Sequence, residues 1–171
     1  PLVLVGDPSP TGGTFRSFGR VRGNDAGDVL FFAVTQTGTD EGTIAGGLFL
    51  RSAVGGGTVR FVRTGDPGDP APGGGTFRQL GDFDVGPGGG FAFAATLTGG
   101  GKSALFRASP PSFALERVVT EGDPTPIGGA FEPFAGSVVR LDDSGELALL
   151  ASVPDDLGGT GARRVHGEVR V

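Results

Sequence analysis

The sequence predicts an all-β fold built from three consecutive units of similar sequence. A ten-residue motif with two prolines and several glycines occurs as GDPSPTGGTF at 6–15, GDPAPGGGTF at 68–77 and GDPTPIGGAF at 122–131. Segments in which apolar residues alternate follow each copy, and period-two spacing is typical of half-buried strands. Stretches free of glycine and proline hardly exceed about ten residues, which leaves little room for helices.

Each unit is expected to contain about four short antiparallel strands. The first strand follows the motif, so that Phe15, Phe77 and Phe131 occupy equivalent positions, as do Phe18, Leu80 and Phe134. A polar turn leads into the second strand, whose alternating positions are Val29, Phe31 and Ala33, then Phe91, Phe93 and Ala95, then Leu147, Leu149 and Ala151. Two further strands complete the unit. The segment 112–121 has helical propensity, but its counterpart 58–64 is typical of a strand, so we expect strands in both.

We expect the chain to begin with the closing strand of a unit, so that the ends of the chain are shifted by one strand from the unit boundaries. The units run roughly over 6–67, 68–121 and 122–171, and the last one lacks its closing strand. A matching apolar strand stands at 1–5 instead. An edge strand of this kind offers unpaired backbone groups to another sheet. We therefore expect it to complete the last unit, the assembly residues being Leu2, Val3, Leu4, Val5, Val169 and Val171.

Four antiparallel strands in about 55 residues is the size of one β-propeller blade. Propellers normally have about four to eight blades, so three blades would make a very small ring. Three arrangements remain open. Two chains share a ring of six blades, or chains join head to tail in an open fibre, or the three units are cut from a longer array.

The motifs also resemble those of an uncharacterised bacterial repeat family. The resemblance rests on GDPxPxGGxF, then NDAGDVLFFA, then GGLFLR, then VRFVRTGDP, and covers nearly the whole chain except the loops 37–46 and 154–161. It implies propeller-like tandem units in a secreted or cell-surface protein. The family carries no established activity, so the resemblance transfers no catalytic residues.

Composition excludes several kinds of partner. The net charge is −5, with a single lysine and no basic run, so a nucleic-acid partner is not expected. No apolar segment approaches the roughly 18 residues of a membrane span. Cysteine is absent, which excludes disulfides and thiolate chemistry. The chain starts with Pro1 and contains no methionine, which favours a processed or excised segment and is compatible with export.

The acidic turns are interpreted as structural. Asp7, Asp69 and Asp123 of the repeated motif are expected to accept backbone N–H bonds within their turns. The hairpin turns NDAGD and DDSGE carry the weak calcium candidates, which are Asp25, Asp28, Asp142 and Glu146. Their spacing does not match a twelve-residue calcium loop, and Asn, Asp and Gly are what a tight hairpin requires. No cofactor or metal is therefore predicted beyond this possibility of calcium.

Enzyme chemistry is not expected. His166 is the sole histidine, and the carboxylate pairs Asp142–Asp143 and Asp155–Asp156 lie in loops without an apolar pocket. All 14 aromatic residues are Phe, mostly at repeat-equivalent core positions, which weakens a sugar-binding interpretation. The sequence favours a structural module that self-associates by strand donation into a closed oligomer or a fibre. The alternative is an extracellular propeller that binds a glycan or a protein through its loops.

Overall fold

The computed structural model describes residues 3–38, 43–65, 67–126, 129–134, 136–152 and 164–167, with backbone alone from 150 onward. The described residues form strands and turns, and they include no helix that is long and apolar enough to cross a membrane. The strands are β1 (Thr14–Gly23), β2 (Val29–Gln36), β3 (Ile44–Arg51), β4 (Thr58–Thr64), β5 (Phe77–Val85), β6 (Phe91–Leu97), β7 (Ser103–Ala108), β8 (Glu116–Thr120), β9 (Val138–Leu141), β10 (Leu147–Ser152) and β11 (Arg164–Gly167).

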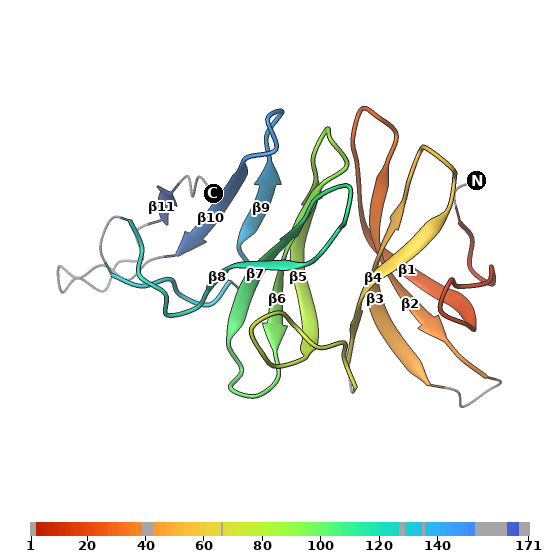
Figure 1. The fold of residues 1–171 in the computed structure, drawn as a ribbon. Coiled ribbons are helices and arrows are strands. Elements are labelled where there is room, and N and C mark those ends of the chain that lie inside the picture. The colour runs from red at the N-terminus through yellow and green to blue at the C-terminus, as the bar shows by residue number, and fades with distance from the viewer. Residues whose placement is uncertain are drawn as a thin grey trace.

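The strands form three antiparallel sheets that follow one another along the chain. The first sheet has the order β1-β2-β3-β4, the second β5-β6-β7-β8, and the third β11-β10-β9. Figure 1 shows the sheets side by side, with the second between the other two. The first strands of the sheets are neighbours, since β5 contacts both β1 and β9. The all-β prediction is confirmed, and the described chain does not close into a ring.

The first two sheets share the same register and irregularities. Phe31 faces Val21 in the first sheet, as Phe93 faces Phe83 in the second. The ladders between the first two strands of each sheet shift in register at the same two places. Those between the third and fourth strands shift after Leu48 and after Leu105. Such shared bulges show that the units repeat as three-dimensional structures. Within the segment 112–121, Glu116–Thr120 forms β8, so the prediction of a strand is confirmed for this part.

The hairpin turn between the first and second strands of each sheet requires a glycine at one position. Gly27, Gly89 and Gly145 have φ angles of +86°, +78° and +81°. Each donates its N–H to the residue three positions earlier. A side chain would be strained in this left-handed region, which glycine adopts freely. The turn therefore needs glycine even though the neighbouring residues differ among the units.

The repeated motif folds into the same turn three times. The Oδ2 atoms of Asp7, Asp69 and Asp123 accept backbone N–H bonds of 2.8, 2.8 and 2.7 Å. The donors are the amides of Leu4, Arg63 and Thr120, which therefore occupy equivalent positions. The first proline of each copy makes an isolated antiparallel bridge within the same copy, pairing Pro8 with Thr14, Pro70 with Thr76 and Pro124 with Ala130. The structural interpretation of these three aspartates is confirmed.

Two expectations about strands are wrong for the described residues. The first strand of the third unit, expected at 129–138, begins only at Val138. Pro133 lies within the missing part and has no N–H to donate to a ladder. Residues 3–5, within the strand expected at 1–5, lie in no strand, and Val3 packs on the first sheet. Leu2, Val169 and Val171 are outside the described residues.

Candidate interaction surface

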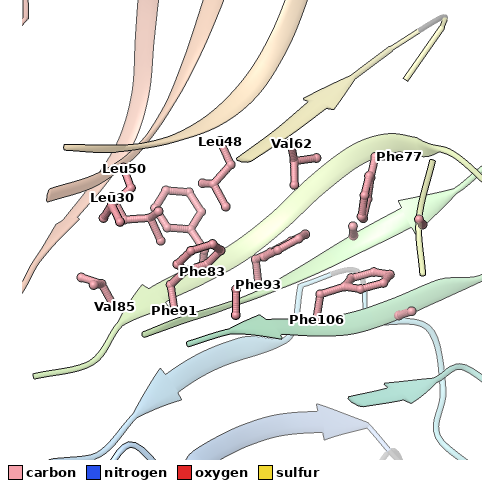
Figure 2. Packing of buried hydrophobic residues seen from close by; sticks show 14 of the residues in the cluster. Leu30, Leu48, Leu50, Val62, Phe77, Phe83, Val85, Phe91, Phe93 and Phe106 are labelled. Carbon is pink, nitrogen blue, oxygen red and sulfur yellow. The ribbon is translucent and has the colours of Figure 1, made fainter. Parts of the chain in front are cut away.

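The sheets pack face to face in a repeated way. We define the leucine face of a sheet by the positions of Leu30, Leu48 and Val62, and the phenylalanine face by those of Phe77, Phe83 and Phe93. Figure 2 shows the leucine face of the first sheet against the phenylalanine face of the second. All six side chains are buried. Each contributes on the order of 1.5–3 kcal/mol by leaving water.

The second junction uses equivalent positions. The leucine face of the second sheet, with Ala92, Leu105 and Val119, packs against the phenylalanine face of the third sheet in one buried cluster. That face is formed by Phe131, Val139 and Leu149. Both junctions therefore place the leucine face of one sheet on the phenylalanine face of the next.

The phenylalanine face of the first sheet has no sheet on it among the described residues. Its positions hold Phe15, Val21 and Phe31, and the rings of Phe15 and Phe31 pack with Phe49. Val21 exposes 51% of its surface and Phe18 exposes 36%. This face is the largest departure from the repeated packing, and it is the candidate interaction surface.

Val3 lies at one side of this open face. It packs on the cluster of Phe15, Phe31 and Phe49. The amides of Leu4, Arg63 and Thr120 donate to the equivalent aspartates of the three motifs. The residues directly before these donors are therefore also equivalent, and they are Val3, Val62 and Val119. Val62 and Val119 belong to the fourth strands β4 and β8. Val3 thus lies on the first sheet where the fourth strand of a preceding sheet would lie.

A shallow apolar groove of about 140 Å³ separates Val3 from the first strand. Its lining consists of Val3, Phe18, Val21, Val29, Phe31 and Arg51. By register, the equivalent positions in the second sheet include Phe83, Phe91 and Phe93. Those belong to the cluster that Leu30 and Leu48 of the first sheet complete. The groove therefore corresponds to the space that a preceding leucine face would fill.

No sheet formed by the described residues covers the leucine face of the third sheet. Ala148 is equivalent to Leu30 and Ala92 by register. Ala148 is exposed, whereas Leu30 and Ala92 have no exposed surface. The described part of the third sheet also ends at β11, with no fourth strand beyond it. The row of sheets thus has two different unpartnered sides.

A buried aspartate ties the first strands of the three sheets together. Asp82 in β5 forms ion pairs with Arg20 of β1 and with Arg140 of β9, the latter at 3.0 Å. Its Oδ2 also accepts the backbone N–H of Val139 at 3.1 Å. Burial raises the pKa of Asp82, but hydrogen bonds from the amides of Val139 and Phe83 and the two arginines outweigh it and hold the pKa below its usual range.

Asp84 extends this cluster along β5. Its Oδ2 accepts the backbone N–H of Leu141 at 3.1 Å, and its Oδ1 lies 3.9 Å from Arg22 Nε. Arg22 also lies 3.7 Å from Asp82. Sequence reasoning missed the cluster. The signal was present, because arginines 20 and 22 in the first unit align with aspartates 82 and 84 in the second.

The calcium candidates form two structural turns instead of one site. Asp28 Oδ1 accepts the N–H of Ala53 at 2.9 Å and the hydroxyl of Ser52 at 3.2 Å. The hydrogen bond from the Ala53 amide lowers the pKa of Asp28 most, and the bonds from the side chains of Asn24 and Ser52 lower it further. Asn24 also donates to the carbonyl of Gly86 at 2.8 Å, which joins two adjacent hairpin turns.

The turn of the third sheet is self-contained. Asp142 Oδ1 accepts bonds from the hydroxyl of Ser144 at 2.7 Å and the N–H of Glu146 at 2.8 Å. The Ser144 hydroxyl and then the Glu146 amide lower the pKa of Asp142. Asp25 lies in the first turn, and the described residues bring no three His, Cys, Asp or Glu side chains together as a metal site. The carboxylates of Asp28 and Asp142 serve turn geometry.

The remaining chemical candidates lie on different elements where the structure describes them. The backbone of His166 lies in β11, opposite Leu150. Asp142 and Asp143 lie in the β9–β10 turn, while Asp155 and Asp156 are outside the described residues.

The comparison with protein families gives one match. The sequence matches the Family of unknown function (DUF7453) over residues 2–167. The chain belongs to this family. No curated protein and no solved structure matches it. The match spans all three sheets, so the repeated packing described above belongs to the region that the family shares.

Proposed function

We propose that this DUF7453 chain is a non-enzymatic structural module whose sheets act as propeller blades and whose copies associate into a closed oligomer or a fibre. The observation that carries the proposal is the open phenylalanine face of the first sheet, where Phe18 and Val21 remain exposed. Association would bury these side chains as the two internal junctions bury their equivalents. Each would contribute about 1.5–3 kcal/mol if it were fully buried.

The two unpartnered sides support head-to-tail association. One end presents a phenylalanine face and the other a leucine face with Ala148, and these are the two faces that meet at each internal junction. Contacts between different faces of identical copies close into a ring when the rotation allows and otherwise continue as a fibre. A ring of two copies would contain six blades, within the ordinary range of about four to eight.

The acidic side chains support a structural role over catalysis. Asp82 binds arginines and backbone amides, and Asp28 and Asp142 hold turns. Following the resemblance to secreted and surface proteins, we place the assembly outside the cell as part of the proposal.

The test is the Val21→Glu variant. Val21 is half exposed in the single chain, so a charge there should leave the fold intact while placing a carboxylate in the proposed interface. The matched control is Val59→Glu, because Val59 exposes 55% of its surface on β4 and Glu116 occupies its register position in β8. We expect light scattering to find the assembly lost in Val21→Glu and retained in Val59→Glu. Equal assembly in both variants would contradict the proposal.

A second candidate function is glycan binding through the loops. A cavity of about 330 Å³ lies between the β5–β6 and β9–β10 turns, with Arg107, Asp143 and Ser144 among its lining residues. Charged and hydroxyl groups at such a site can bind sugar hydroxyls. The test is a glycan array probed with the labelled chain and with Asp143→Ala. Binding that depends on Asp143 would support this function, and absence of binding to neutral and acidic glycans would oppose it.

A further inference from the structure

We propose that the partner on the open face is the third sheet of a second copy, and that residues 3–5 of the first copy pair with β11 of that second copy in one defined register. This inference rests on the proposed self-association. It adds the identity of the two surfaces, the donated strand and the residue pairs.

The first argument is the position of the N-terminal segment. In the two internal junctions, a valine of the fourth strand packs with the phenylalanine face of the next sheet: Val62 in the first cluster and Val119 in the second. Val3 packs with the phenylalanine face of the first sheet in the same way. Its neighbour Leu4 donates to Asp7, as Thr120 donates to Asp123. Among the described residues, the segment has the place of a fourth strand on the first sheet and pairs with no strand of its own.

The second argument is that, within the described residues, the third sheet lacks the fourth strand that the other two sheets have. Its described strands are the equivalents of a first, a second and a third strand, in the order β9, β10 and β11. In the other sheets the third strand pairs with a fourth, as β3 pairs with β4 and β7 with β8. An unpaired edge offers backbone donors and acceptors to an added strand.

The third argument is the match in side-chain type to the second internal junction. There, the leucine face carries Ala92 and the phenylalanine face carries Phe131, Phe134 and Val139. On the two open sides, the equivalent residues are Ala148 on one and Phe15, Phe18 and Val21 on the other. The ring centroids of Phe15 and Phe18 are 5.4 Å apart, close to the 5.7 Å between Phe131 and Phe134. In the second junction, an alanine of the leucine face packs with two phenylalanines and a valine. The third sheet of another copy carries Ala148 at the same position and can pack in the same way on Phe15, Phe18 and Val21.

The fourth argument fixes the register. Leu48 pairs with Phe32 on one side and with Val62 on the other, and Leu105 pairs with Ala94 and Val119. His166 pairs with Leu150, the residue equivalent to Phe32 and Ala94. The open edge at His166 therefore corresponds to Val3. Continuing the antiparallel ladder by one residue places Val165 opposite Leu4.

The absence of cysteine makes this register directly testable. The residues of an antiparallel pair have Cα atoms about 4.5–5.5 Å apart, within the range that a disulfide spans. We propose mixing two single-cysteine variants of the full chain, Leu4→Cys and Val165→Cys, under mild oxidation. The control mixture is Leu4→Cys with His166→Cys, which is one residue out of register and would place the two thiols on opposite faces of the sheet.

The expected result is a covalent pair that contains one copy of each variant. It should form at least about tenfold faster than in the control mixture, because assembly gives the in-register thiols a high effective concentration. A chain that carries both Leu4→Cys and Val165→Cys should give a covalent ring or ladder on a non-reducing gel.

Three results would overturn the inference. If the mixed variants assemble but the two mixtures cross-link equally slowly, the register is wrong while the proposed self-association stands. If the double variant forms only an intrachain disulfide in a monomer, the chain closes on itself. If the cysteine variants and the unaltered chain are all monomeric, both this inference and the proposed function fail.

Discussion

Val21 and Phe83 occupy the same register position in β1 and β5, yet Val21 exposes 51% of its surface while Phe83 exposes 1%. The difference arises because the first sheet covers Phe83, whereas no sheet covers Val21 among the described residues. An exposed apolar residue at a position that is buried elsewhere in the same chain marks a surface that lacks its partner.

Truncating these two residues should therefore have different effects. Phe83→Ala should lower the free energy of unfolding by about 3–5 kcal/mol, because it leaves a cavity in the junction between the first two sheets. Val21→Ala should change the unfolding of the single chain by less than about 1 kcal/mol but weaken association. Urea unfolding at low protein concentration and light scattering at high concentration measure the two effects. A loss of stability in Val21→Ala as large as in Phe83→Ala would refute this account of the junction.

Asp82→Asn should destabilise the packing of the three first strands. The asparagine retains the size of the side chain but loses the charge that Arg20 and Arg140 bind. Weakening the partners of buried polar groups lowers the free energy of unfolding by about 1–3 kcal/mol. Asp25→Asn, in an exposed hairpin turn, is the control. Urea unfolding that gives both variants the stability of the unaltered chain would show that the cluster contributes nothing.

Acid should weaken the fold through the same carboxylate. The folded-state pKa of Asp82 lies below its ordinary value of about 3.9, so its contribution is fully present above that value and is lost as pH falls through the folded pKa. Asp28 and Asp142, whose pKa values are also lowered, act in the same direction. We expect the melting temperature to decline below about pH 4, and to decline less steeply in Asp82→Asn. An equally steep decline in the variant would assign the acid sensitivity to other groups.

Asp7→Ala should release the N-terminal segment without unfolding the sheets. Its bond to the N–H of Leu4 holds Val3 on the open face, and such turn and cap bonds contribute about 1 kcal/mol. Asp123→Ala removes the equivalent bond to Thr120 inside the chain and serves as the control. Light scattering should show weaker assembly in Asp7→Ala, while thermal unfolding should show the greater loss of stability in Asp123→Ala. The reverse pattern would remove the N-terminal segment from the interface.

Calcium should not stabilise the protein. A bound ion would raise the melting temperature in proportion to its occupancy of the folded state. Because Asp28 and Asp142 already accept hydrogen bonds from their own turns, we expect equal melting temperatures in calcium and in a chelator. A calcium-dependent rise that Asp142→Asn abolishes would restore the metal interpretation.

The sequence predicted the parts of the fold that depend on local pattern. Alternation predicted β2, β6 and β10, and the proline and glycine motif predicted a turn whose aspartates accept backbone bonds. The first strand of the third unit was predicted to begin too early, because the effect of Pro133 on the ladder was outweighed by the alignment with Phe15 and Phe77.

The sequence could not predict which sheet faces meet. The open face depends on the relative placement of sheets, so Val21 and Phe83 look alike in the sequence although only one is covered. The pairing of Asp82 with Arg20 and Arg140 joins residues from three units, and only their alignment could have indicated it. The N-terminal segment was expected to be the closing strand of the last unit, whereas the structure places Val3 on the first sheet.

The most direct test of self-association is the mass of the unaltered chain in solution, measured by sedimentation equilibrium over a range of concentrations. The account predicts a mass of two chains, or a series of higher multiples of 17.1 kDa, and loss of these species when residues 1–5 are deleted. A constant mass of 17.1 kDa at every concentration would contradict it.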